Sequence, residues 1–235
     1  MGSTITFLGQ STLLIETAGG QTIYIDPWLK DNPVCPEKFR TPHKADLICL
    51  THGHWDHTGD VFPVFDANPC PVTGHMDLVR CLARHHDLGE FARPHGKGGT
   101  INYGNVKVTL TNAFHGSAYG PTGEYAGEAC GIILTFEDGR RIYHAGDTCL
   151  FSDMKLIGEL YTPDLCFLPI GDRATMDPEH AAIAVEFLGA KRVIPIHHSS
   201  IPGLTGKPEN FVAEVAKRCP GTEVTVMKPG EKIIV

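Results

Sequence analysis

One short segment constrains what this chain can fold into more than any other. Residues 51–57 read Thr-His-Gly-His-Trp-Asp-His, so three histidines and an aspartate fall within six positions. They directly follow an apolar run at 47–50, which is typical of a strand buried on both faces. Imidazole nitrogen and carboxylate oxygen are ligands that zinc-like cations prefer, and a polar surface loop is the weaker alternative. The ligands predicted from this segment are His52, His54, Asp56 and His57.

A metal site needs ligands from more than one loop, and the sequence offers three more in equivalent places. Each follows a predicted strand: one at 106–110, one that ends at 143, and one at 193–196. The carboxyl ends of strands are where open α/β sheets assemble their sites from loops. Each side chain alone could be an ordinary turn or core residue, but together with the first segment they predict one shared site. These further ligands are His115, Asp147 and His197.

The order of the predicted elements favours a layered α/β (α+β) fold. A strand meander opens the chain, and later strands alternate with helices expected near 75–86, 178–188 and 211–218. No linker or short repeat divides the 235 residues. We therefore expect a single domain, residues 1–235, with more than one layer.

Composition and charge limit the kinds of partner that we expect for this chain. The formal net charge is -7 and no Lys/Arg cluster is present, which argues against nucleic acid. There is no apolar run long enough to span a membrane and no signal-peptide pattern, so we expect a cytoplasmic protein without a membrane partner. The eight cysteines are scattered without a Cys-x-x-Cys pair, and we interpret them as free, mostly buried thiols.

The ligand pattern resembles the metallo-β-lactamase superfamily. Further motifs make the chain similar to its UlaG-like, UPF0173-type metal-dependent hydrolases, over nearly the whole length. Members of this branch often carry His where Gln10 stands here. The motifs are Leu8-Gly9-Gln10-Ser11, Ile25-Asp26-Pro27-Trp28, His144-Ala145-Gly146-Asp147-Thr148, and Gly171-Asp172 through Thr175-Met176.

The resemblance implies a four-layer αββα sandwich with both sheets inside. It also implies two divalent metal ions, with zinc preferred and manganese, iron or nickel as alternatives that the same ligands accept. His52, His54 and His115 would hold one ion. Asp56, His57 and His197 would hold the second, and Asp147 would bridge the two.

The expected function is hydrolysis by a hydroxide bridged between the two ions. Two cations about 3.5–4 Å apart lower the pKa of a shared water and polarise the substrate oxygen. Asp56 would be the catalytic residue, because it can bind metal and also accept or orient the proton of that water. A small phosphodiester, a cyclic phosphate or a lactone-type ester would suit this chemistry. The alternatives are a non-catalytic metal- or ligand-binding module on the same fold, and a redox role with iron.

Several polar residues have supporting roles in this hypothesis. Thr51 and Asp172 are candidates for orienting the ligand imidazoles. His180, in the first turn of its helix, could protonate a leaving group, although a solvent-facing position is favoured. His144 is expected to pack or support rather than bind metal, and His198 to point away from its neighbour. The strand at 232–235 could pair within the sheet or build a homo-oligomer.

Overall fold

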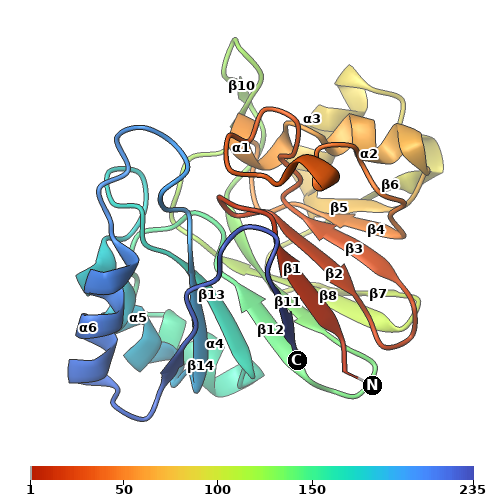
Figure 1. Cartoon of the computed structure of the whole chain (residues 1–235). Coiled ribbons are helices and arrows are strands. Elements are labelled where there is room, and N and C mark those ends of the chain that lie inside the picture. Colours follow the sequence, from red (N-terminus) through yellow and green to blue (C-terminus); the bar gives the residue numbers. More distant parts are fainter. Residues whose placement is uncertain (1) are drawn as a thin grey trace.

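Two mixed β-sheets pack face to face, with helices on both outer surfaces (Figure 1). The structure is a computed structural model that describes residues 2–235. Helices α4, α5 and α6 lie outside one sheet, and α2 and α3 lie outside the other (Figure 1). The expected α/β, four-layer αββα arrangement is therefore confirmed.

The first sheet begins with an antiparallel meander and continues as parallel strands. Pairing is antiparallel from β16 to β3 and parallel from β3 to β6. The expected opening meander is confirmed. In sheet order the strands are β16 (Lys232–Ile234), β1 (Thr4–Phe7), β2 (Leu13–Glu16), β3 (Thr22–Ile25), β4 (Leu47–Cys49), β5 (Val72–His75) and β6 (Ala92–His95).

The second sheet has the same division into parallel and antiparallel halves. The parallel half runs from β15 to β12, and β12, β11, β8 and β7 pair antiparallel. In sheet order the strands are β15 (Glu223–Val224), β14 (Arg192–Ile196), β13 (Leu165–Pro169), β12 (Arg141–His144), β11 (Cys130–Thr135), β8 (Val106–Asn112) and β7 (Thr100–Tyr103).

Helices α2, α3, α4 and α5 each bury an apolar face beside a sheet, and α6 packs on α5. Asp177 accepts a hydrogen bond from His180 N and so caps α5, which has Pro178 in its first turn and ends at left-handed Gly189. The helices are α1 (Trp55–Thr58), α2 (Val61–Ala67), α3 (Met76–His85), α4 (Met154–Tyr161), α5 (Pro178–Leu188) and α6 (Pro208–Arg218), with short 3-10 turns η1 (Glu37–Phe39) and η2 (Gly89–Phe91).

Three apolar clusters correspond to the three contacts between layers. The central cluster joins the inner faces of both sheets and includes Ile5, Leu110 and Ile132. A second cluster lies between the first sheet and α2 and α3, and a third lies between the second sheet and α4 and α5. Because these clusters hold the strands rigidly, the loops at the strand ends have a fixed platform.

One local prediction was wrong, and two local features were not predicted. The loop at 116–127 contains a short hairpin, β9 (Ala118–Tyr119) and β10 (Glu124–Tyr125). Helix α6 begins at Pro208 rather than 211, because proline suits the first turn of a helix. His95 is buried, with Nδ1 3.0 Å from Thr73 Oγ1. No helix among residues 2–235 has both the length and the apolar character that crossing a membrane requires.

Helices α4 and α5 approach too closely for a side chain at Gly158. A Cβ atom there would lie 2.4 Å from Leu188 O. Alanine normally stabilises a helix interior, but here the backbone contact should dominate. We expect Gly158→Ala to lower the free energy of unfolding by about 1–3 kcal/mol in urea denaturation. The matched control is Gly221→Ala, where a Cβ would meet nothing within 4 Å. Equal unfolding midpoints for the two variants would contradict the packing argument.

Candidate metal centre

The seven predicted ligands come from the carboxyl ends of strands in both sheets. His52 and His54 follow β4, while Asp56 and His57 lie in α1, at the upper edge of the sandwich in Figure 1. The loops after β8, β12 and β14 contribute the other three, His115, Asp147 and His197. Within each of two groups, the candidate ligand atoms lie within 4.8 Å of one another. The structure thus brings all seven side chains to one region.

The first group contains three imidazoles. His52 Nε2 lies 3.0 Å from His54 Nδ1, and His115 Nε2 lies 3.2 Å from the same atom. Burial lowers the pKa of each ring, most strongly that of His52. Neutral rings keep a free lone pair, so these three nitrogens are ready to bind a cation.

The second group pairs two imidazoles with two carboxylates. Asp147 Oδ1 lies 3.3 Å from His57 Nε2, and Asp147 Oδ2 lies 3.0 Å from His197 Nε2. Burial lowers the pKa of His197, but the Asp147 carboxylate outweighs this effect and raises that pKa to about 9. The carboxylates of Asp147 and Asp56 likewise raise the pKa of His57 well above its ordinary value, against the effect of burial. Without metal, this group is therefore an internal network of ion pairs.

Asp147 lies between the two groups. Its Oδ2 atom is 3.6 Å from His115 Nε2 in the first group, while the same carboxylate contacts both imidazoles of the second. Burial alone would raise the pKa of Asp147, yet His197 and His57 hold it well below the ordinary range. One carboxylate can thus face two cations at once.

The chemistry of the cluster fits metal ions. His57 Nε2 and Asp147 Oδ1 are both buried and have no hydrogen-bond partner within the described residues. The two atoms face each other at 3.3 Å as an ion pair, but the lack of a hydrogen bond is costly for buried polar atoms, and a divalent cation would satisfy both of them. The donor set of imidazole nitrogen and carboxylate oxygen is one that zinc, manganese, iron and nickel accept.

Asp26 orients ligands in both groups, and sequence analysis gave it no role. Its Oδ2 atom accepts hydrogen bonds from His57 Nδ1 at 2.7 Å and from Thr51 Oγ1 at 2.6 Å, and its Oδ1 accepts from Thr51 N. Thr51 Oγ1 lies 3.0 Å from His52 Nδ1, which makes it the acceptor for that ring nitrogen. Thr51 thus lies where the expected orienting role requires it. Directing Nδ1 protons to Asp26 and Thr51 leaves Nε2 of His52 and His57 free.

Gln10 holds Asp56 in place. Its Nε2 donates a 2.7 Å hydrogen bond to Asp56 Oδ2, and its Oε1 accepts from Ser200 Oγ. Its carbonyl oxygen accepts from His197 N at 2.7 Å. An uncharged amide therefore contacts one predicted ligand through its side chain and another through its backbone.

Left-handed backbone is concentrated around the cluster. Gln10, Asp26 and His197 have φ values of 55°, 49° and 56°, although none is glycine. Such conformations persist only where surrounding contacts enforce them, and they often occur at functional sites. Gly146 is left-handed too, and a Cβ there would lie 2.8 Å from Cys130 O and from Thr51 Cβ. The residue before Asp147 must therefore be glycine.

Two predicted supporting residues do not contact the cluster. The carboxylate of Asp172 accepts hydrogen bonds from Arg173 N and Thr205 Oγ1, so its expected role on an imidazole was wrong. The neighbouring Gly171 instead packs against His197, where a Cβ would lie 2.9 Å from Nδ1. The side chain of His180 is 57% exposed and lies 3.6 Å from Asp177, so the solvent-facing alternative holds.

Two other histidines stay outside the ligand groups. His144 Nε2 is 2.9 Å from Ser11 O, and its Nδ1 accepts from Gly146 N, so both ring nitrogens are already paired. This matches the expected packing role. His198 Nδ1 lies 3.1 Å from Ser199 Oγ, and the ring takes no part in the groups.

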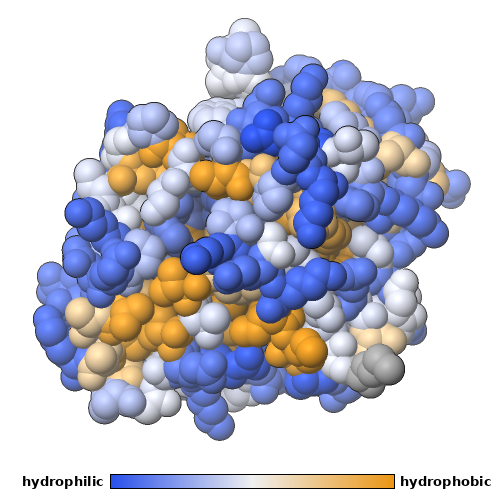
Figure 2. All heavy atoms as spheres, in the orientation of Figure 1, coloured by the Kyte–Doolittle hydropathy of each residue, from blue (hydrophilic) through white to orange (hydrophobic). Residues whose placement is uncertain are grey.

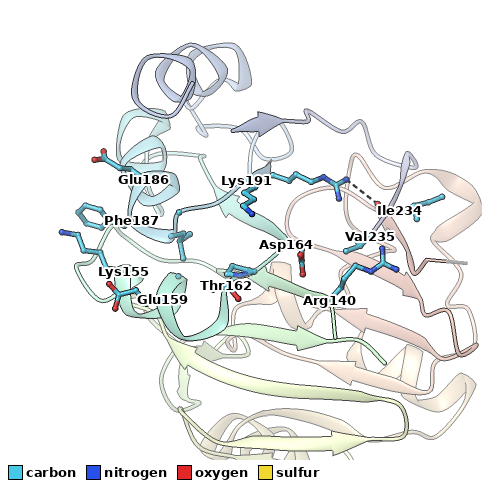
Figure 3. Close-up of a pocket in the computed structure, with 15 residues that line it drawn as sticks. Arg140, Lys155, Glu159, Thr162, Asp164, Glu186, Phe187, Lys191, Ile234 and Val235 are labelled. Carbon is cyan, nitrogen blue, oxygen red and sulfur yellow. Dashed lines mark hydrogen bonds between the residues drawn. The ribbon is translucent and has the colours of Figure 1, made fainter. Parts of the chain in front are cut away.

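A hollow of about 570 Å³ lies at the other end of the strands (Figure 3). Its lining includes Arg140, Asp164 and Lys191, which precede β12, β13 and β14 respectively. The seven predicted ligands all follow strands instead. This hollow is therefore separate from the candidate metal centre.

The fold and this cluster define a metal-dependent hydrolase of the metallo-β-lactamase type, and comparison with known proteins agrees. Residues 21–198 match the family model described as "Beta-lactamase superfamily domain". A UPF0173 metal-dependent hydrolase of Rubrobacter xylanophilus is 44% identical over 236 residues, covering 99% of this chain and 96% of the relative. A Geobacillus protein with the same family description is 44% identical over 97% of this chain and 98% of its own length. The chain belongs to the UPF0173 metal-dependent hydrolases.

Solved structures support the fold. Igni18, a metallo hydrolase from Ignicoccus hospitalis, is 31% identical with a TM-score of 0.88, covering 100% of this chain and 99% of its own. An isothiocyanate hydrolase from Delia radicum gut bacteria has a TM-score of 0.73 at 21% identity and covers 98% of both chains. At that identity the likeness supports the fold alone.

Removing the Asp26 carboxylate should weaken metal binding. Asp26→Asn keeps the shape but cannot accept all three hydrogen bonds, so His57 loses its fixed orientation. We expect metal affinity to fall about 10- to 100-fold, measured by competition with a chelator. The control is Asp172→Asn, which changes an exposed carboxylate without an imidazole partner. This variant should bind metal with the affinity of the wild type. Equal affinities for the two variants would count against the role of Asp26.

Metal binding should release protons near neutral pH. His197, with a pKa of about 9, and His57, with a raised pKa, both carry an extra proton in the metal-free chain below that pH. Binding a metal requires neutral rings, so zinc should displace roughly two protons per chain at about pH 7. Release should decrease as pH rises through the pKa of His197, because that ring is then already neutral. A pH indicator in weakly buffered solution measures this, and pH-independent release would contradict the assignment.

Proposed function

We propose that this chain is a dinuclear hydrolase whose two divalent ions, zinc in preference, are held by the seven clustered ligands. The observation that carries the proposal is the position of Asp147, whose carboxylate reaches ligands of both groups. His52, His54 and His115 would hold one ion, and Asp56, His57 and His197 the other. When bound, the two ions would lower the pKa of a shared water toward 7 and polarise the substrate oxygen.

The protein itself positions the groups around that water. Asp56 is proposed to accept or orient the proton of that water. Burial raises its pKa, but His57 and His197 hold it below the ordinary range, so the carboxylate is ionised at neutral pH. Its Oδ2 atom is fixed by Gln10, which leaves the orientation of the carboxylate independent of solvent. His180 has no part in this proposal because its side chain faces solvent.

We propose a small-molecule substrate with a hydrolysable ester bond, either a small phosphodiester, a cyclic phosphate or a lactone-type ester. Two exposed aromatic rings lie next to ligands: Trp55 in α1, beside Asp56 and 59% exposed, and Phe114 in the loop after β8, beside His115 and 54% exposed. Exposed aromatic side chains beside a site favour contact with an apolar part of a ligand. A cytoplasmic location is also proposed, because all eight cysteines are free thiols.

A homo-oligomer remains part of the hypothesis. Strand β16 is at the edge of its sheet, and its residue Ile234 is 65% exposed. Figure 2 shows apolar side chains gathered on the lower part of this face, around that strand. An exposed sheet edge with apolar neighbours is a surface that another strand can pair with.

The proposal is tested by metal content followed by a hydrolysis screen. We expect about two transition-metal ions at the seven ligands of each chain, and hydrolysis of at least one phosphodiester or lactone substrate. Asp56→Ala should reduce kcat by at least about 100-fold, because it removes a ligand and the proton acceptor together. Asp66→Ala, which removes an exposed carboxylate paired with His86, is the matched control and should keep full activity.

Protein that binds no metal and stays inert after zinc or manganese is added would contradict the proposal. A chain that binds two ions but hydrolyses none of the substrates would instead favour the non-catalytic binding module. Complete ligand groups count against that alternative, since a module without catalysis has no need for all seven side chains.

The aromatic rings give a prediction about substrate preference. Trp55→Ala should raise KM about 10-fold or more for an ester with an aromatic acyl group, because one contact surface is lost. It should change KM little for a short aliphatic ester, and metal content should stay the same. Equal effects on the two esters would contradict a role for Trp55 in recognising the substrate.

A further inference from the structure

A second group of metal-binding side chain types lies where α3 meets the β9–β10 hairpin. Cys81 and His85 are four residues apart on α3 and therefore share one face of that helix. Glu124 comes from β10, on the opposite side of the contact. Their sulfur, nitrogen and oxygen atoms all lie within 4.8 Å of one another. None of these three side chains belongs to the candidate metal centre.

These side chains already interact without a metal. His85 Nε2 lies 2.6 Å from Glu124 Oε2, and Arg84 Nε donates to Glu124 Oε1 at 3.2 Å. Cys81 is fully buried, whereas the side chains of His85 and Glu124 are 45% and 33% exposed. The sulfur therefore closes the inner side of the group, and an ion can enter from the outer side.

We propose that Cys81, His85 and Glu124 form an additional zinc-type metal site, with water as the fourth ligand. The donor set is specific, because thiolate and imidazole select zinc or a similar ion over magnesium and calcium. The charges of the ligands also support the site, because one thiolate and one carboxylate together balance the two positive charges of a divalent cation. Arg84 competes with the ion for Glu124, so occupancy of the site depends on metal supply.

This site would restrain the hairpin beside the candidate metal centre. The base of the hairpin is tied to the ligand loop, because Gly53 N donates to Ser117 Oγ at 3.1 Å and Ser117 Oγ donates to Ala126 O at 2.9 Å. Gly53 lies between His52 and His54. Fixing Glu124 to α3 therefore limits the motion of a segment that contacts the ligand loop. The role is structural, and it does not depend on the proposed hydrolysis.

Cobalt(II) tests the site, because a thiolate ligand adds a charge-transfer absorption in the near ultraviolet. The candidate metal centre contains no cysteine, so this band would report on Cys81. Full-length protein freed of metal with a chelator is titrated with cobalt(II). We expect about one ion more per chain than the main centre holds, accompanied by the thiolate band. Cys81→Ser should lose the band and that ion, whereas Cys219→Ser, a partly exposed cysteine at the end of α6, should keep both.

Two further variants keep the test valid if Cys81→Ser folds poorly. His85→Ala removes an exposed ligand and should weaken cobalt binding at this site at least about 10-fold, while binding at the main centre is retained. Arg84→Gln removes the competitor for Glu124 and should tighten binding. A missing thiolate band in the wild type, or a band unchanged in Cys81→Ser and His85→Ala, would overturn the site and leave only an ion pair. The outcome is separate from that of the hydrolysis screen, because none of these residues is a ligand of the main centre.

Discussion

The metal centre depends on the hydrogen bonds that the buried carboxylate of Asp26 accepts. This carboxylate joins His57 of one ligand group to Thr51, and through Thr51 to His52 of the other group. A buried carboxylate is stable only when its lone pairs are satisfied, so the position of each donor is constrained by the others. The left-handed backbone of Asp26, at the end of β3, directs the carboxylate toward these donors. The order of the strands in the sheet then determines which loops lie close enough to contact this carboxylate.

The seven clustered side chains could be predicted because their signal is local. Four occur within six residues, and the other three each follow an apolar strand pattern. The partners of these side chains could not be predicted in the same way. Gln10 meets Asp56 across 46 positions, and Asp26 meets His57 across 31, and both contacts exist only after the sheets have formed. The motif Ile25-Asp26-Pro27 at a strand end was the available signal for Asp26.

The layered fold was predictable for a similar reason, while several elements were not. Alternation and turn residues indicated the meander, and Asp177, Pro178 and Gly189 bounded α5. Helix α4 has no side-chain cap, and α2 contains a proline, so both lack the usual boundary signals. The β9–β10 hairpin pairs only two residues on each side, which is too short for a periodic pattern. Asp172 was misjudged because adjacency in a motif does not determine where a side chain points.

The ion pairs of the second ligand group have a consequence for how the protein matures. Because Asp56 and Asp147 are already balanced by His57 and His197, their negative charges need no metal to be tolerated in the interior. Small zinc domains cannot fold before they are loaded, whereas this chain has three large apolar clusters to stabilise it. Synthesis and metal acquisition are thus separable events. The ion that such a preformed acceptor finally holds is decided by the metals that the cell supplies, as much as by the ligands themselves.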